Sequence, residues 1–170
     1  LNTLAGAHGI GRIDMVENRL VGIKSREIYE APAAVTLLAA HRKIETLTMT
    51  KQQLRMKERV AQEYADLVYD GLWFSAHHQD LDAYVRSTQR HVTGQVRLRL
   101  WRGHAEAIGV VAERSLYHYG LATYGAEDTF DQQAALGFIK LWGLPIEVQA
   151  RQQLLRDGID PLRLTTPEEN

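Results

Sequence analysis

Apolar residues alternate with polar ones in two stretches of the chain, and this pattern predicts strands. Between residues 12 and 29 the apolar residues alternate or gather in short runs around Asn18 and Arg19, which predicts two short strands. From Thr93 to Trp101 the alternation is strict. A turn at residues 102–104 and a returning strand at residues 105–111 follow it, so this stretch predicts an antiparallel hairpin.

In most of the remaining chain the apolar residues recur at helical spacing. Pro32 suits the first position of a helix that runs to about Leu47 and is predicted to be largely buried. Thr50 and Gln53 form a capping-box pattern at the start of the longest predicted helix, which continues to Gly71. The two helices follow one another after the first pair of strands.

Further segments are predicted with less regular patterns. Residues 1–5 have the spacing of the last turn of a helix, and a helix is predicted at residues 79–91. Residues 115–124 are predicted as a strand with loops. Asp131 caps a helix to about residue 141, Gly143 and Pro145 are predicted to break it, and a second helix ends near residues 157–158. Because strands and helices come in separate runs, the predicted class is α+β, with an antiparallel sheet packed against several helices.

Composition and charge exclude several classes of protein. The chain has 170 residues, 45% of them apolar, which is enough for about one domain with a core. Its formal net charge of -1 favours neither nucleic acid nor an acidic membrane as a partner, and no apolar run reaches the roughly 18 residues of a membrane span. The absence of cysteine excludes disulfides, and the seven histidines form no metal-binding motif. We expect a soluble, cytoplasmic protein without a metal site.

Two groups of residues near the N-terminus are candidates for a binding site. The run Gly9-Ile10-Gly11-Arg12 could bring backbone amides and a guanidinium to an anion, or it could be the turn that ends a helix, with a surface arginine. Glu17 and Tyr29 lie in the two predicted strands. A carboxylate beside a phenol suits a neutral polar or zwitterionic ligand, whereas an exposed glutamate and a core tyrosine would need no ligand. These residues alone leave both questions open.

A third candidate is a small basic and aromatic patch on the predicted hairpin, which could bind nucleic acid and would do so in a salt-dependent way. A solvated sheet face or a subunit contact would produce the same pattern, so we rank this hypothesis low. The patch consists of Arg97, Arg99, Trp101 and Arg102.

The segment from His8 to Pro32 resembles the argininosuccinate synthetase family. The run GIGRIDMVENR, followed by KSR and IYEAP, is similar to two blocks of that family at their expected spacing. The resemblance continues through ADLVYDGLWFS at residues 65–75, VTG at 92–94, SLY at 115–117 and GFI at 137–139. It therefore covers nearly the whole chain, up to about the last fifteen residues.

The resemblance implies a ligase that condenses citrulline and aspartate with ATP, giving argininosuccinate, AMP and pyrophosphate in arginine biosynthesis. In that family the matching glutamate and tyrosine contact citrulline, which assigns citrulline binding to Glu17 and Tyr29. Their implied role is binding and positioning, with no proton transfer. The residues expected to support them are Arg12, Lys24, Ser25 and Arg26.

The resemblance also implies that ATP, with magnesium, is bound by a preceding nucleotide-binding domain. The chain contains no phosphate-binding loop and begins at Leu1 rather than Met, so we expect it to be the C-terminal part of a longer enzyme, inactive in isolation. One residue departs from the family pattern, because Glu27 stands where the family usually has glycine. If that position required a positive φ, the glutamate would be strained.

Homotetramer formation is a further implication, with the terminal helix reaching a neighbouring subunit. We expect an α+β domain at residues 1–143, an oligomerisation helix at 144–158 and a tail at 159–170. A lone helix from Pro145 to Asp157 would be about 20 Å long and marginal in water, so it should need a partner surface. The alternative to the enzyme is a stand-alone, non-catalytic oligomerisation module of the same fold.

Overall fold

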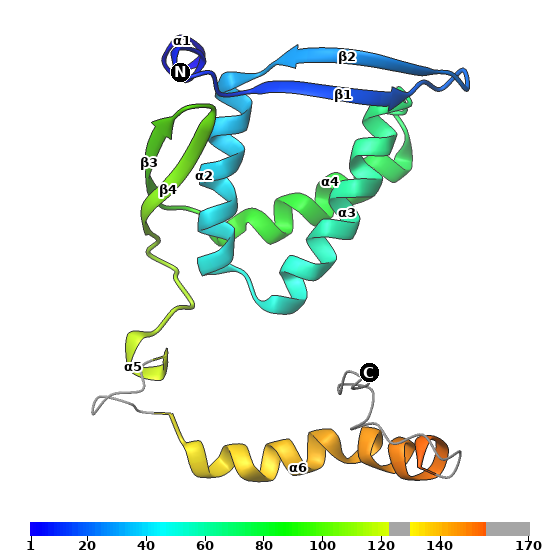
Figure 1. Cartoon of the computed structure of the whole chain (residues 1–170), viewed down its shortest axis with the longest axis vertical. Coiled ribbons are helices and arrows are strands. Elements are labelled where there is room, and N and C mark those ends of the chain that lie inside the picture. Colours follow the sequence, from blue (N-terminus) through cyan, green and yellow to red (C-terminus); the bar gives the residue numbers. More distant parts are fainter. Residues whose placement is uncertain (123–129, 156–170) are drawn as a thin grey trace, which may run out of the picture. The chain divides into compact units, whose positions relative to one another are not determined.

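The structure, a computed structural model, describes residues 1–122 and 130–155. The chain divides into two compact units, residues 1–118 and residues 119–170. The first unit contains α1 (Asn2–Ala7), β1 (Arg12–Asn18), β2 (Lys24–Glu30), α2 (Pro32–Thr48), α3 (Lys51–Tyr69), α4 (Ala76–Thr88), η1 (Gln89–His91), β3 (Gln95–Trp101) and β4 (His104–Val111) (Figure 1).

The α+β class is confirmed, and the antiparallel strands form two separate two-stranded sheets, β1–β2 and β3–β4. In β3 Val96, Leu98 and Leu100 are half-buried and the arginines are exposed, as the alternation predicts. The predicted turn between β3 and β4 is also present. Its two residues, Arg102 and Gly103, have φ values of 44° and 86°, which is typical of a tight hairpin connection.

Side-chain caps set the starts of α3 and α4. The predicted capping box of α3 is present, with the Thr50 side chain accepting from the Gln53 backbone N–H and the Gln53 side chain accepting from Thr50. Helix α4 begins at Ala76, three residues before the prediction, because the Ser75 hydroxyl accepts a hydrogen bond from the His78 backbone N–H. The apolar spacing after residue 79 did not include this first turn.

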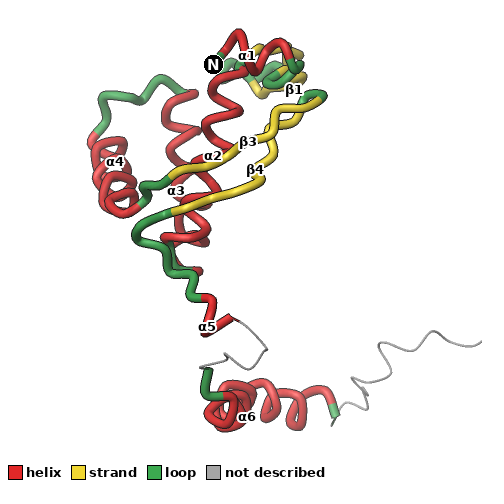
Figure 2. Tube along the Cα trace, turned by 90° about the vertical axis from the view of Figure 1, so that its left-hand side faces the viewer, coloured by secondary structure: helices red, strands yellow, loops and turns green. Residues whose placement is uncertain are grey.

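Helix α2 contacts the N-terminal helix α1 and both strands of the β3–β4 hairpin, which runs beside it (Figure 2). The prediction that this helix is largely buried is wrong, since Leu37 and Leu38 are 59% and 53% exposed. The other elements of this unit cover only part of the surface of α2. The buried apolar side chains of the described residues are correspondingly few: Ala5, Ile10, Met49, Val60 and Leu67.

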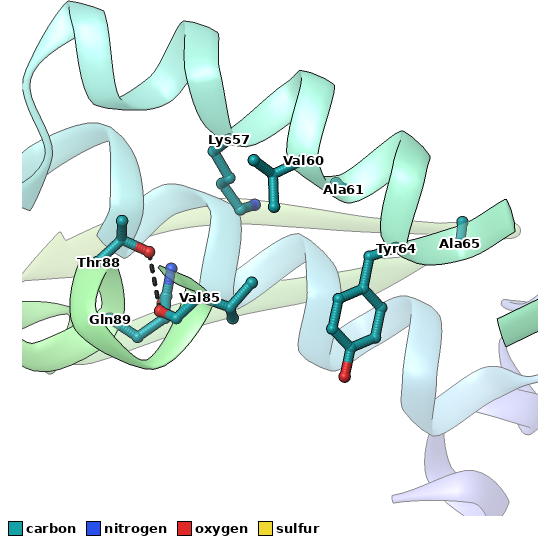
Figure 3. Close-up of a pocket in the computed structure, with 8 residues that line it drawn as sticks. All are labelled: Lys57, Val60, Ala61, Tyr64, Ala65, Val85, Thr88 and Gln89. Atoms are coloured by element: carbon teal, nitrogen blue, oxygen red, sulfur yellow. Dashed lines mark hydrogen bonds between the residues drawn. The ribbon is translucent and has the colours of Figure 1, made fainter. Parts of the chain in front are cut away.

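A buried polar cluster joins three helical elements. Glu45 of α2 is only 2% exposed, and its carboxylate contacts Lys57 Nζ of α3 at 2.7 Å and accepts from Gln89 Nε2 of η1 at 3.0 Å. An apolar cavity of about 260 Å³ lies beside this cluster, between α3 and α4 (Figure 3). Its lining consists of Lys57, Val60, Ala61, Tyr64, Ala65, Val85, Thr88 and Gln89.

The second unit contains α5 (Tyr119–Ala122), α6 (Gln132–Gln149) and a π-helical turn at Ala150–Leu154. The strand predicted at residues 115–124 is wrong, because residues 115–118 form no strand and α5 follows; residues 123 and 124 lie outside the described residues. Apolar residues without a period of two could not distinguish a loop and a short helix from a strand.

The break predicted at Gly143 and Pro145 is also wrong, since α6 continues through both residues to Gln149. An interior proline removes one backbone hydrogen bond, and the residues beyond it still form theirs. An ion pair between Glu147 and Arg151, one helical turn apart, supports the continuation. The helix end predicted near residues 157–158 and the tail lie outside the described residues.

Within residues 1–122 and 130–155, no helix is long and apolar enough to cross a lipid bilayer. The same residues place no group of three or more His, Asp or Glu side chains where they could hold a metal ion.

Candidate functional site

The β1–β2 hairpin brings the two predicted ligand-binding residues together. Glu17 pairs with Ser25 across the hairpin and Tyr29 pairs with Ile13, so the alternation of side chains places Glu17 and Tyr29 on the same face. The Tyr29 hydroxyl donates a hydrogen bond to Glu17 Oε1. The two residues that the sequence singled out are therefore in direct contact.

A second tyrosine reaches the same carboxylate from a helix. Tyr69, the last residue of α3, donates from its hydroxyl to Glu17 Oε2 at 2.9 Å. Figure 1 shows how the end of β1 approaches the end of α3 to allow this contact. Glu17 is only 5% exposed, so an ionised carboxylate is held here under cover of its partners.

Arg19 lies beside the carboxylate and is fixed by three groups of the hairpin. Its Nη1 is 3.5 Å from Glu17 Oε2, its Nε donates to Ser25 Oγ at 2.8 Å, and its Nη2 pairs with Glu27 Oε1 at 2.7 Å. The turn after β1 holds Arg19 in place, because its backbone carbonyl accepts from Gly22 and its N–H donates to Ile23. A cation is thus fixed next to Glu17 Oε2.

These contacts determine the protonation of the site. Hydrogen bonds from Tyr29 and then Tyr69 hold the pKa of Glu17 below its ordinary value, with burial opposing them and Arg19 assisting them. Because each tyrosine donates a hydrogen bond to the Glu17 carboxylate, the pKa of Tyr29 and that of Tyr69 are both raised. At neutral pH Glu17 is therefore ionised, and Tyr29 and Tyr69 are protonated.

Glu27 does not strain the backbone beside Tyr29. It lies within β2 opposite Met15, and among the described residues Arg102 is the one non-glycine residue with a positive φ. The Glu27 carboxylate pairs with Arg19, so this side chain takes part in the cluster.

The four residues predicted to support the site divide between the two faces of the hairpin. Ser25 lies opposite Glu17 and anchors Arg19. The others alternate to the opposite face, where they bind elsewhere: Arg12 pairs with Glu30, Lys24 donates to Asn18 Oδ1, and Arg26 forms two hydrogen bonds to Asp14.

The glycine-rich run before β1 forms the turn that ends α1. Gly9 and Gly11 have φ values of 73° and 84°, and the N–H of Ile10 donates back to the Ala5 carbonyl. A side chain at Gly11 would meet the backbone of Ala31 and Pro32 at 2.5 Å or slightly more. The geometry is that of a close backbone approach, with Arg12 exposed and paired to Glu30.

The basic and aromatic patch on the β3–β4 hairpin is partly neutralised. Arg99 forms an ion pair with Glu106 of β4, and the Arg102 guanidinium lies over the Trp101 ring at 4.9 Å from its centroid. No observation favours nucleic acid at this surface.

Sequence reasoning missed three members of the site: Arg19, Glu27 as a partner, and Tyr69. Tyr69 lies within the ADLVYDGLWFS block that resembles the family, but helical periodicity marks it only as part of α3. Nothing in the sequence shows that the end of α3 meets the end of β1.

Comparison with known proteins assigns the chain to a family. The family described as "Arginosuccinate synthase C-terminal domain" matches residues 1–149. The chain is 57% identical over 153 residues to argininosuccinate synthase of Dehalococcoides mccartyi, which covers 90% of the chain and 38% of that protein. For the proteins of the same name from Rubrobacter xylanophilus and Oceanobacillus iheyensis, the identities are 59% over 145 residues and 56% over 150 residues, covering 85% and 88% of the chain and 36% of each relative. The chain thus spans little more than a third of the length of these relatives.

Proposed function

Because the chain belongs to the argininosuccinate synthase family and corresponds to its C-terminal domain, we propose that it forms the citrulline-binding part of a carbon–nitrogen ligase. The complete enzyme condenses citrulline with aspartate in arginine biosynthesis, at the expense of ATP. The observation that carries this proposal is the covered Glu17 carboxylate in contact with Tyr29.

The proposed reaction needs precise placement of a weakly reactive group. The ureido carbon of citrulline is a poor electrophile, because its nitrogen lone pairs feed electrons into the carbonyl. The ureido oxygen attacks the α-phosphorus of ATP and pyrophosphate leaves. The aspartate amine then attacks the ureido carbon, AMP departs with the oxygen, and the amine loses a proton. Holding citrulline in line for both steps is the contribution that binding residues make.

The protonation of the site matches this task. Glu17, kept ionised by its hydrogen bonds, accepts from N–H groups of citrulline, while Tyr29 stays protonated and fixes the orientation of the ligand. A carboxylate whose pKa is lowered is a weak base. Both residues therefore bind and position the substrate, and neither transfers a proton.

ATP and its magnesium ion belong to a preceding nucleotide-binding domain, which is the first partner of this chain. In support, the glycine-rich turn before β1 ends a helix and packs against Ala31 and Pro32, leaving no cradle for a phosphate. An ATP-consuming reaction of amino-acid synthesis is consistent with a cytoplasmic location.

A homotetramer is the second part of the proposal, with α6 as the element that contacts a neighbouring subunit. Its large apolar side chains are all at least 50% exposed, and the rings of Phe138 and Trp142 stack with their centroids 5.6 Å apart. Apolar surface of this extent on one helix is stabilised when another surface covers it. Because α6 begins at Gln132, the proposed oligomerisation segment extends beyond residues 144–158.

The test uses the complete enzyme that contains this chain. In Glu17→Ala the KM for citrulline should rise by about ten- to a hundredfold, as expected for the loss of hydrogen bonds to a charged group, while the KM for ATP changes little. Asp14→Ala is the matched control, because Asp14 lies in the same strand on the opposite face and pairs with Arg26. Unchanged KM and kcat for citrulline in Glu17→Ala would falsify the assignment.

A further inference from the structure

We propose that Tyr69 is a positioning residue for citrulline: it holds Glu17 Oε2, so that the carboxylate presents Oε1 and the Tyr29 hydroxyl to the ligand. This inference rests on the proposed function and adds to it a residue that does not itself touch citrulline. It assigns different tasks to the two oxygens of one carboxylate.

The first observation is that the two oxygens have separate partners from separate elements. Tyr29 of β2 donates to Oε1, and Tyr69 of α3 donates to Oε2. A side chain with three rotatable bonds is thereby fixed at both ends of its carboxylate. The contact from α3 also sets how the loop end of the hairpin meets the helix.

The second observation is that the Oε2 side is the more crowded one. Arg19 Nη1 lies 3.5 Å from the same oxygen, and Arg19 is itself tied to Ser25 and Glu27. Each carboxylate oxygen offers two lone pairs. Oε2 therefore faces a phenol and a guanidinium, whereas Oε1 has one protein donor and retains capacity for an N–H of the ligand.

The third observation concerns what remains when a ligand binds at Oε1. A ligand N–H takes the second lone pair of Oε1 and shares that oxygen with the Tyr29 hydroxyl. The Tyr69 hydrogen bond lies at Oε2 and is undisturbed by the ligand, so it keeps the carboxylate ionised and in place throughout binding. Loss of this support leaves the binding residue present but loosely held, which lowers affinity.

The experiment is a double-mutant cycle in the complete enzyme, with KM values for citrulline and for ATP. Tyr69→Phe keeps the ring and removes the hydroxyl, and it should raise the KM for citrulline about three- to tenfold without changing that for ATP. In Glu17→Gln/Tyr69→Phe the second substitution should add little to the first, because Tyr69 acts only through the Glu17 carboxylate.

A pH profile separates this role from a structural one. The groups that face Glu17 are Tyr29 and Glu27 from β2, Arg19 from the turn and Tyr69 from α3. Removing the Tyr69 donor raises the pKa of Glu17 towards its ordinary value. The KM for citrulline should then begin to rise at a higher pH on acidification in Tyr69→Phe than in the unaltered enzyme.

Tyr64→Phe is the matched control, because Tyr64 belongs to the same helix and its hydroxyl is also 2.9 Å from a partner, His78 Nε2. It should leave the KM for citrulline and its pH profile unchanged. Circular dichroism identifies a temperature at which Tyr69→Phe and Tyr64→Phe are both folded, and the kinetics of the two variants are compared at that temperature.

The outcomes separate the two proposals. If Glu17→Gln leaves citrulline kinetics unchanged, the proposed function is wrong. If Glu17→Gln impairs citrulline use but Tyr69→Phe does not, or if the two effects multiply independently, the positioning role is overturned and the proposed function stands.

Discussion

Lys57 Nζ lies 2.7 Å from Glu45 Oε2, and this ion pair joins α3 to α2 around a carboxylate that is 2% exposed. The other oxygen accepts from Gln89 Nε2 and lies 3.2 Å from His41 Nε2. A covered carboxylate with this number of partners determines how three helical elements meet. Removing this carboxylate leaves several donors without an acceptor, and an unsatisfied buried donor lowers the stability of the fold.

Glu45→Ala should therefore lower the free energy of unfolding by about 1–3 kcal/mol. Glu63→Ala is the control, since Glu63 is more than half exposed and pairs with His77 at the surface, and it should change stability by less than about 0.5 kcal/mol. Chemical denaturation of both variants measures the difference. Equal effects would mean that the buried cluster does not stabilise the helices.

The sharp turn before β1 gives a second prediction. Gly11 has φ 84°, and a Cβ there would lie 2.5 Å from the Ala31 carbonyl carbon and the Pro32 nitrogen; Gly22 has φ 86° and open space around it. Gly22→Ala should cost about 1–2 kcal/mol from the left-handed backbone alone. Gly11→Ala should cost about 1–3 kcal/mol more, because backbone atoms must also move. Thermal unfolding of the two variants tests this order, and a smaller effect at Gly11 would contradict the close approach.

Titration of the site gives a third prediction with opposite signs at the two ends of the pH range. The pKa of Glu17 is lowered from about 4.5, so its contribution to stability is present above that value and is lost as the pH falls through the lowered pKa. The pKa values of Tyr29 and Tyr69 are raised from about 10, so their contribution is present below pH 10 and is lost as the pH rises through the raised values.

Glu17→Gln should lower the raised pKa values of Tyr29 and Tyr69 towards the ordinary value of about 10, because it removes the charged acceptor. An ultraviolet titration of tyrosinate measures this change. Glu63→Gln, at the exposed pair with His77, should leave the titration unchanged. Identical curves for Glu17→Gln and the unaltered protein would be incompatible with the two hydrogen bonds.

The fourth prediction concerns α6 and the proposed tetramer. Trp142 is 75% exposed and stacks on Phe138, and its neighbour Lys140 provides a polar position on the same helix. Trp142→Glu should lower the mass that light scattering measures for the complete enzyme, because it buries a charge in the proposed contact. Lys140→Glu should leave the mass unchanged. A full-mass assembly of Trp142→Glu would rule out α6 at this residue as the contact.

Local patterns predicted the elements well where a cap or a period of two was present. The capping box at Thr50 and Gln53 and the alternation from Val96 to Leu100 correspond directly to α3 and β3. Pro145 led to a wrong prediction. Proline tends to break a helix, but the backbone hydrogen bonds on either side of it keep α6 continuous. Residues 115–118 had no period that could separate a loop from a strand.

The site was predictable only to the extent that its members lie in one hairpin. The family blocks pointed to Glu17 and Tyr29, and the register of β1 with β2 brings them together. Tyr69 reaches the site from α3. Its position depends on packing between segments that are distant in the sequence, so no local sequence pattern predicts it. The exposure of Leu37 and Leu38 has a similar origin, since burial depends on surfaces that this unit does not supply.

The hydrogen bond from the Gly103 N–H to the His8 carbonyl, at 2.7 Å, has a consequence for the order of folding. It fastens the turn of the β3–β4 hairpin to the segment that leads into β1, although the two lie at opposite ends of the first unit in sequence. A contact between such distant positions forms late, because a long loop must close first. During synthesis the strand that carries Glu17 emerges before the second hairpin, and it acquires this anchor only after the ribosome has completed that hairpin.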